Sequence, residues 1–306
     1  MRMKKSGTPF LGSKFAGSPE GVDAAIFGAP HGTPYPGIDN RPYAAAAASL
    51  RKAIVDDAEF RDSWDFDFDA TLLGGEDFRV ADLGDLPTKS KDGAGNRKLI
   101  ADCTRAILAA GAIPIMIGGD DSVPIPFIEA FADHGPLTIL QIDAHIDWRD
   151  ERFGEHLGFS STMRRASEMT HVKAMNQVGM RGIGSAREAE VRYARDWGAK
   201  LITARAIHER GIGLALDDIP HGANCLITLD CDAIDGATMP AVAYPTPGGL
   251  TYTQVTGLIH GLAEKARIVG FDLIEFVPKR DPNGFAAFTA ARIIWNVIGS
   301  LANARK

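Results

Sequence analysis

The stretch Leu137-Thr138-Ile139-Leu140-Gln141-Ile142-Asp143-Ala144-His145-Ile146-Asp147 decides the fold. Its apolar first half predicts a buried strand. Successive side chains of an extended chain alternate between two faces, so Asp143, His145 and Asp147 are predicted to share one face. Two carboxylates and an imidazole there are suitable ligands for a divalent metal ion. Taken alone, the stretch fits a strand end with solvated polar residues equally well.

A second acid-rich strand end favours the metal site. The apolar run from Cys225 to Leu229 ends in Asp230-Cys231-Asp232. The same alternation places Asp230 and Asp232 on one face. A single Asp-x-Asp is common at strand ends, whereas two such ends predict a cluster of like charges. Such a cluster needs a cation to hold it together when it is buried.

The composition predicts a globular protein with a large core. Of the 306 residues, 45% are hydrophobic and 24% are charged, which is ordinary for a soluble domain. The net charge of −6 and the lack of a Lys/Arg block argue against nucleic-acid binding. The three cysteines have no metal-binding spacing and fit reduced thiols. We see no signal peptide and no run that we expect to span a membrane, so we expect a cytoplasmic protein.

Strand-like and helix-like segments alternate over most of the chain. The predicted strands cover 24–28, 80–83, 113–117, the run before Asp143, 176–180, 200–203, the run before Asp230, and 267–274. The predicted helices cover 44–57, 96–110, 125–132, 163–169, 186–197, 204–216, 252–266 and 286–303. This order predicts a mainly parallel sheet with helices on both faces. Residues 1–20 are predicted to form an irregular arm, and residues 21–306 one α/β domain, because no linker interrupts them.

Polar residues follow four of the predicted strands. They are Gly118–Ser122, Asp143–Asp147, Asp230–Asp232 and Glu275. In an open parallel sheet, ligands bind outside the carboxyl ends of the strands. We therefore expect these four strand ends to meet in one crevice.

Other catalytic signatures are missing. The turn Gly182-Ile183-Gly184 lacks the third glycine of a dinucleotide site, and no P-loop is present. A Gly-x-Ser-x-Gly elbow is also absent, so no serine nucleophile is indicated. Among the histidines outside the Asp143 stretch, only His31 and His156 lie in segments that could reach the crevice.

These residues together resemble a known family. Asp143-Ala144-His145-Ile146-Asp147, followed by Asp230-x-Asp232-x-x-Asp235, is similar to the paired signatures of the ureohydrolases, the arginase and agmatinase family. Further matching segments extend the resemblance over nearly the whole chain: Gly28-Ala29-Pro30, Arg41-Pro42, Gly118-Gly119-Asp120, Pro247-Gly248-Gly249-Leu250 and Glu275. The chain looks more like the agmatinase-type bacterial members than like arginase proper.

The resemblance implies a three-layer αβα fold with two divalent ions, usually manganese, with nickel as the alternative. It implies that a metal-bridging hydroxide attacks the guanidinium carbon of the substrate and releases urea. A metal-generated hydroxide suits this chemistry, because guanidinium is a poor electrophile. The implied metal ligands are Asp121, Asp143, His145, Asp147, Asp230 and Asp232, with Asp143 and Asp230 bridging the ions or Asp230 sharing that role with Asp232. Glu275 would hold the guanidinium, and homo-oligomers, trimers or hexamers, are expected.

Two departures from the family pattern affect the site. The family's Gly-Gly-Asp-His reads Gly-Gly-Asp-Asp here, so Asp121 replaces an imidazole. We expect a more electronegative site whose bound water is less acidic. The loop after Asp147 lacks the family's His-Gly pair, and Ser160 and Ser161 stand there as substrate-binding candidates. His156 is the candidate that could compensate, so the predicted catalytic residues are Glu275, Asp147 and His156.

The sequence therefore predicts a binuclear-metal amidinohydrolase that cleaves an agmatine-like guanidine compound to urea and an amine. One alternative is a hydrolase of guanidine, an alkylguanidine or a guanidino acid, with nickel in place of manganese. The other is a non-catalytic subunit in a hetero-oligomer with an active paralogue. Candidate entrance residues are His31, Asp39, Asn40 and Arg41.

Overall fold

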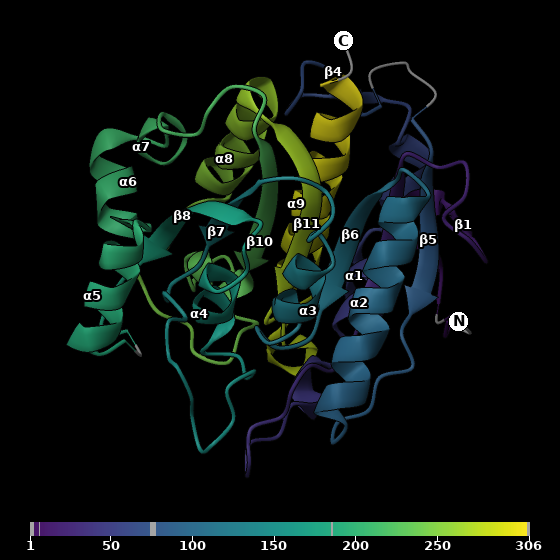
Figure 1. The fold of residues 1–306 in the computed structure, drawn as a ribbon. Helices are drawn as coiled ribbons and strands as arrows, with labels where there is room; N and C mark the ends of the chain where they lie inside the picture. Colours follow the sequence, from purple (N-terminus) through teal and green to yellow (C-terminus); the bar gives the residue numbers. More distant parts are fainter. Residues whose placement is uncertain (1–2, 6, 74–77, 185, 305–306) are drawn as a thin grey trace.

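A nine-stranded sheet runs through the protein, and all neighbouring strands in it are parallel (Figure 1). The structure is a computed structural model that describes residues 3–5, 7–73, 78–184 and 186–304. In spatial order the strands are β1 (Lys14–Phe15), β5 (Val80–Asp85), β2 (Ala24–Ala29), β6 (Ile113–Gly118), β11 (Arg267–Ile274), β10 (Asn224–Asp230), β7 (Leu137–Ile142), β8 (Val172–Met180) and β9 (Lys200–Thr203).

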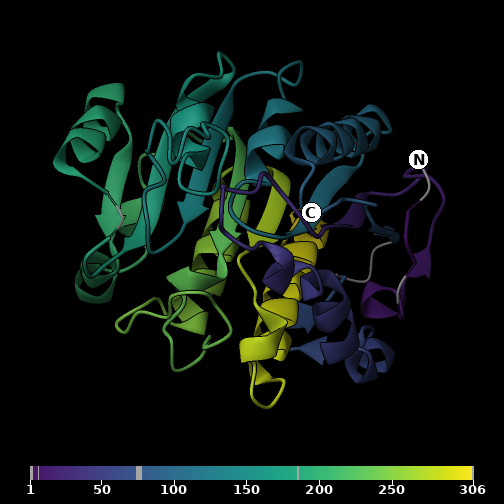
Figure 2. The same ribbon diagram turned by 90° about the horizontal axis from the view of Figure 1, so that it is seen from below.

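Helices cover both faces of this sheet, as Figure 2 shows in a view turned by 90°. The helices are α1 (Ala46–Ala53), α2 (Gly93–Ala109), α3 (Pro124–Glu129), α4 (Thr162–Ser167), α5 (Glu188–Trp197), α6 (Ala204–Arg210), α7 (Gly213–Leu216), α8 (Tyr252–Lys265) and α9 (Phe285–Asn303). Short 3-10 turns η1 (Phe10–Gly12), η2 (Arg41–Tyr43), η3 (Asp56–Phe60), η4 (Cys231–Ala233) and η5 (Pro278–Arg280) and a small hairpin of β3 (Trp64–Asp65) and β4 (Ala70–Thr71) lie in the connections.

The alternation of side chains along each strand divides the core into two. Ile227 and Leu229 of β10 pack into the cluster that contains α1 and α6 to α9. Leu226, the residue before Ile227, points to the other face and packs into the cluster that contains α2 to α5. A strand buried on both faces is apolar throughout, which explains the unbroken hydrophobic runs in the sequence. The predicted three-layer αβα architecture is therefore confirmed.

Several predicted boundaries need correction. The first twenty residues are not wholly irregular, because Lys14 and Phe15 form β1, which pairs with Ala81 and Asp82 of β5. The predicted helix 204–216 is two helices, α6 and α7. Gly211, which follows α6 with φ 86°, ends the first of them, because a left-handed residue cannot continue an α-helix.

The helix α9 is long and apolar enough to cross a membrane, contrary to our expectation from the sequence. It has 19 residues and a mean hydropathy of 1.4, but 83% of that window is buried within the protein. It packs against α1, α8 and β11. These contacts make α9 a core helix of the α/β fold.

The four strands that were predicted to carry the site lie side by side in the middle of the sheet. They are β6, β11, β10 and β7, in this order. Because the strands are parallel, their carboxyl ends open onto the same edge. The fold therefore brings together polar residues that lie up to about 150 positions apart, as in the hydrogen bond between Asp121 and Glu275.

Candidate metal centre

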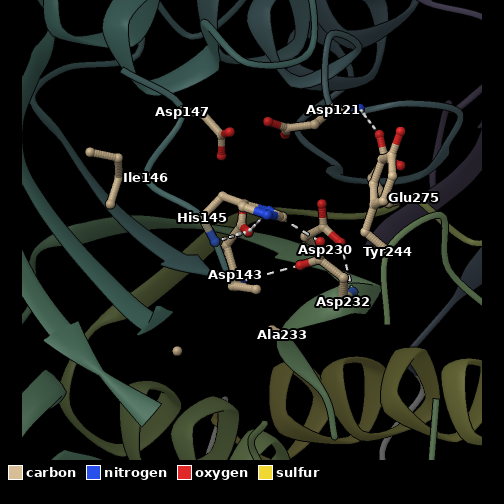
Figure 3. Close-up of polar contacts among 12 residues, drawn as sticks. Asp121, Asp143, His145, Ile146, Asp147, Asp230, Asp232, Ala233, Tyr244 and Glu275 are labelled. Carbon is tan, nitrogen blue, oxygen red and sulfur yellow. Dashed lines mark hydrogen bonds and ion pairs between the residues drawn. The ribbon is translucent and has the colours of Figure 1, made fainter. Parts of the chain in front are cut away.

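Five acidic or imidazole side chains from three of the strand ends form two overlapping clusters, and Asp230 lies beside them (Figure 3). The first contains Asp143, His145 and Asp232, and the second contains Asp121, Asp143 and Asp147. In each cluster the potential ligand atoms lie within 4.8 Å of one another. Asp143 belongs to both, so its carboxylate stands where a ligand shared by two ions would be.

The loop after β7 reaches the centre by a turn and not by strand alternation. The strand ends at Ile142, and Asp143 still donates its backbone N–H to the carbonyl of Val178 on β8. Gly179 follows with φ 114°, and a Cβ there would lie 2.7 Å from the carbonyl oxygen of Asp143. Only glycine allows this close approach. Asp147 then takes a left-handed conformation, φ 51°, which turns its side chain back towards Asp143.

Hydrogen bonds fix the carboxylates around the first cluster. The Asp143 Oδ1 accepts the backbone N–H of His145 at 2.6 Å, and Asp232 Oδ1 accepts that of Ala144 at 3.2 Å. Asp232 donates its own N–H to Asp230 Oδ1 at 2.7 Å. The imidazole Nδ1 of His145 lies 3.1 Å from Asp232 Oδ2 and 3.5 Å from Asp143 Oδ1. These contacts orient the side chains before any ion binds.

The buried negative charge of the metal-free site favours the binding of a cation. Burial, and then the charges of the neighbouring carboxylates, raise the pKa of Asp121, Asp147, Asp230 and Asp232. Burial alone would lower the pKa of His145, but its hydrogen bonds to Asp143 and Asp232 and their charges raise it to about 12. A proton on His145 thus supplies positive charge in the metal-free protein.

An unpaired oxygen supports the same conclusion. Asp121 Oδ2 is buried without a hydrogen-bond partner in the part of the chain that the structure describes. Leaving such an oxygen unpaired costs free energy unless an ion or water binds it. The aspartate that replaces the family histidine therefore lies within reach of an ion, and the residues present fit two divalent ions.

Glu275 lies beside this centre at the end of β11, with φ 62°. Its Oε1 accepts the backbone N–H of Asp121 at 2.9 Å, and its carboxylate also accepts a hydrogen bond from Tyr43. Burial and the charge of Asp120 raise the pKa of Glu275 to about 8. A cation brought next to Glu275 would favour its ionised form.

A cleft of about 510 Å³ leads to these groups. Of the predicted site residues, those that line the cleft are Asp121, His145, Asp147, Ser160, Asp230, Asp232 and Glu275, together with the entrance candidates Asp39 and Asn40. Asp143 lies below the lining, and Asp230 lines the cleft but belongs to neither cluster. The bridging role of Asp230 therefore stays a prediction from the sequence.

His156 and Ser161 do not lie where the sequence predicted. The side chain of His156 is about half exposed, and its Nδ1 contacts the carbonyl of Asp150 at 3.0 Å, outside the cleft lining. Ser161 is fully buried behind the lining. Proximity in sequence misled us here, because the loop from Asp150 to Ser160 turns His156 outward. Ser160 does line the cleft, where its hydroxyl pairs with Tyr35 at 2.6 Å.

Sequence reasoning missed Tyr43, Arg152 and Gln141. Tyr43 and Arg152 line the cleft, and Gln141 donates hydrogen bonds to Asp143 and Asp147. The sequence signal for Gln141 was a polar side chain inside an otherwise apolar strand, which has to find a partner when buried. For Tyr43 and Arg152 there was no such signal, since loop residues of these types are usually solvated.

Comparisons with known proteins identify the family of this chain. The family model described as "Arginase family" matches residues 22–299. The mitochondrial guanidino acid hydrolase of Homo sapiens is 30% identical over 291 residues, which are 93% of this chain and 80% of that protein. The mitochondrial agmatinase of Gallus gallus is 28% identical over 289 residues, 92% of this chain and 82% of that protein.

A solved structure shares the fold. The Trypanosoma cruzi formiminoglutamase, whose crystal structure contains Mn²⁺, superposes with a TM-score of 0.79 at 18% identity and covers 97% of this chain and 99% of that one. At that identity the likeness concerns the fold. The family match covers far more than half of the chain. This chain belongs to the arginase family and is a ureohydrolase that acts on C–N bonds of linear amidines.

Proposed function

We propose that this chain cleaves a linear guanidine compound to urea and an amine at a centre that holds two divalent ions. The observation that carries the proposal is the pair of ligand clusters that share Asp143 below one cleft. Asp143, His145 and Asp232 would hold one ion, and Asp121, Asp143 and Asp147 the other. Two such ions, when bound, supply a hydroxide nucleophile near neutral pH. Manganese is the proposed metal, with nickel as the alternative, since oxygen and imidazole ligands suit both.

The remaining residues bind and orient the substrate. Glu275 would accept a charge-assisted, two-point hydrogen bond from the guanidinium, which fixes the plane of the reacting carbon. Tyr43 and the backbone N–H of Asp121 hold the Glu275 carboxylate in place. Because both donors are neutral, they orient the carboxylate without cancelling the charge that attracts the substrate.

The prediction from sequence favoured an agmatine-like amine at the tail of the substrate. The cleft lining supports the alternative, a guanidino acid. Arg152 lines the cleft, and its guanidinium lies over the rings of Tyr35, Phe153 and Phe159 at 5.6, 5.0 and 5.8 Å. It forms no ion pair with any carboxylate among the described residues. A substrate carboxylate would pair with this cation, whereas the ammonium of agmatine would be repelled by it.

Urea release over a guanidine panel tests both parts of the proposal. The metal-free protein is loaded with Mn²⁺ or Ni²⁺ and assayed with agmatine, guanidinobutyrate, guanidinopropionate, methylguanidine and guanidine. We expect metal-dependent urea release that is faster for the guanidino acids than for agmatine. If two ions bind and no compound of the panel yields urea, the hydrolytic proposal is contradicted and the non-catalytic subunit is favoured. Metal analysis of the same samples separates that result from a failure to bind ions.

A further inference from the structure

A buried chain of hydrogen bonds runs from the second ligand cluster into the interior. Gln141 Nε2 donates to Asp143 Oδ2 at 2.7 Å and to Asp147 Oδ2 at 2.8 Å. Gln141 Oε1 accepts from Nε2 of Gln177, its register partner on β8. Gln177 Nε2 also donates to the carbonyl of Ile146 at 2.9 Å, and its Oε1 accepts from the indole of Trp148 at 2.6 Å. The side chains of Gln141, Gln177 and Trp148 are at most 1% exposed.

The chemistry at the far end of this chain fixes its direction. The indole N–H of Trp148 can only donate, so the Gln177 atom that it contacts must be the oxygen. The carbonyl of Ile146 can only accept, which places the Gln177 amide nitrogen on the other side. The oxygen of Gln141 then faces Gln177, and its amide nitrogen faces the two carboxylates. Every donor and acceptor of both amides is used, so neither can flip without leaving buried groups unpaired.

The donor that touches the carboxylates carries no net charge. In the metal-free protein Asp143 and Asp147 are held close together by the two N–H bonds of Gln141 and by a hydrogen bond between their own carboxyl groups. A lysine or arginine in this position would hold them as well, but its charge would oppose the binding of a divalent ion. A neutral amide leaves the full negative charge of both carboxylates to the ion.

We propose that Gln141, Gln177 and Trp148 are positioning residues that set the affinity of the Asp121–Asp143–Asp147 site for its ion. This rests on the proposed function, since it concerns the second of the two ions. The proposal predicts that substitutions of these residues change the metal affinity of the two sites to different extents. The Asp143–His145–Asp232 site keeps the backbone donors of Ala144 and His145 on its carboxylates. Among the described residues, the carboxyl group of Asp147 is oriented by side chains, the amide of Gln141 and the carboxyl group of Asp143.

The test is a calorimetric titration of the metal-free protein with Mn²⁺. The wild type is expected to bind two ions, and the variants Asp121→Ala and Asp232→Ala assign the two binding steps to the two sites. We expect Gln141→Met to weaken the Asp121–Asp143–Asp147 site by 10- to 100-fold, a usual range for partners that orient metal ligands. The other site should change less than about threefold. Trp148→Phe removes only the indole N–H that donates to Gln177. We expect it to lower the Mn²⁺ affinity of the Asp121–Asp143–Asp147 site by about 3- to 10-fold.

Asn176→Leu is the matched control. Asn176 precedes Gln177 on β8, and its buried amide donates to the carbonyl of Ala215 at 2.7 Å, away from the metal ligands. The substitution Asn176→Leu should lower thermal stability without changing either of the two Mn²⁺-binding steps. Equal weakening of both sites by Gln141→Met, or unchanged binding in both Gln141→Met and Trp148→Phe, would refute the positioning role. Should Gln141→Met fail to fold, Trp148→Phe decides alone. Failure of the wild type to bind two ions would instead refute the proposed function.

Discussion

Asp147 and Glu275 both place a carboxylate at the centre from a left-handed backbone, with φ of 51° and 62°. They follow different strands, β7 and β11, and face the same cleft. A left-handed conformation costs a non-glycine residue about 1–2 kcal/mol. The fold therefore keeps two strained residues where the proposed chemistry needs them, a pattern common at functional sites.

The strain at Glu275 can be measured with a pair of substitutions. Both Glu275→Ala and Glu275→Gly remove the carboxylate, but only glycine relieves the backbone. We expect the metal-free Glu275→Gly variant to be more stable than Glu275→Ala by about 1 kcal/mol in urea unfolding. The same pair at Asp230, whose φ is −79°, is the control, and there alanine should be at least as stable as glycine. Equal stabilities of the two Glu275 variants would argue against strain.

The metal-free protein should lose stability as the pH rises from 6 to 8. The pKa of Glu275 is raised from 4.5 to about 8, so between these values the folded state binds a proton that the unfolded state has released. The same holds for His145 above pH 6.5, because its pKa is raised to about 12. More protons bound in the folded state mean that stability falls with pH, by up to about 1.4 kcal/mol per pH unit for each group.

Urea unfolding at pH 6 and pH 8, with EDTA or with saturating Mn²⁺, checks this expectation. Ions should replace the protons, so the loss of stability should disappear in the loaded protein. At a metal concentration one hundred times the dissociation constant, one ion adds about 2.7 kcal/mol of stability. A metal-free protein that is more stable at pH 8 than at pH 6 would contradict the electrostatic description of the site.

Arg51 should be important for stability. Its side chain is 1% exposed, and it donates to Asp82 at 2.7 and 2.9 Å and to Asp85 at 2.6 Å, which ties α1 to β5. Arg51→Met leaves the buried Asp82 without its counter-charge, and we expect a loss of about 3–5 kcal/mol. Arg41→Met is the control. Arg41 pairs with Asp39 at 2.8 Å on the surface, where the two side chains are 73% and 51% exposed, and its loss should cost less than about 1 kcal/mol.

Arg152 should set the preference for the substrate tail. Arg152→Met removes the cation and keeps an apolar side chain on Tyr35 and Phe159. We expect the ratio of kcat/KM for guanidinobutyrate to that for agmatine to fall by about 10- to 100-fold, the range expected for the loss of one charged hydrogen-bonded contact. Arg152→Lys should keep most of the preference. If Arg152→Met lowers kcat/KM equally for both substrates, Arg152 does not determine the preference for the substrate tail.

The substitution Asp121→His should shift the pH dependence of the reaction. Asp121→His replaces a carboxylate with the neutral imidazole that the family pattern carries. With less negative charge around the ions, the water that they activate should be more acidic. We expect the acidic limb of the kcat/KM profile to move to lower pH, measured in samples of matched metal content. An unmoved limb would show that the extra carboxylate does not tune the nucleophile.

Strands and helices were predicted where the local pattern alone decides the structure. The strand 267–274 and the strand 200–203 have the predicted bounds. The helix that begins at Tyr252 follows a capping box of Thr251 and Gln254, which is visible in the sequence. The hairpin of β3 and β4 was missed, because strands of two residues have no period to detect, and residues 74–77 of that region lie outside the described part.

The site was predicted in outline and not in its details. The carboxylates converge as expected, because parallel strands share one edge. Asp147 was expected to face the site because side chains alternate along a strand. A left-handed turn, which the alternation rule does not predict, places it there instead. The link from Gln141 to Gln177 spans 36 positions and depends on strand register, which a single sequence does not give. The oligomeric state and the compartment stay predictions.

The side-by-side arrangement of β6, β11, β10 and β7 has a consequence for biosynthesis. β11, which separates β6 from β10, and Glu275 at its end are synthesised after the other three strands of this group. Until β11 is inserted, the ends of β6 and β10 cannot take their places beside it, and the acidic residues they carry cannot surround two ions. Metal capture should therefore require β11, and nascent fragments that stop short of residue 267 should bind divalent ions poorly.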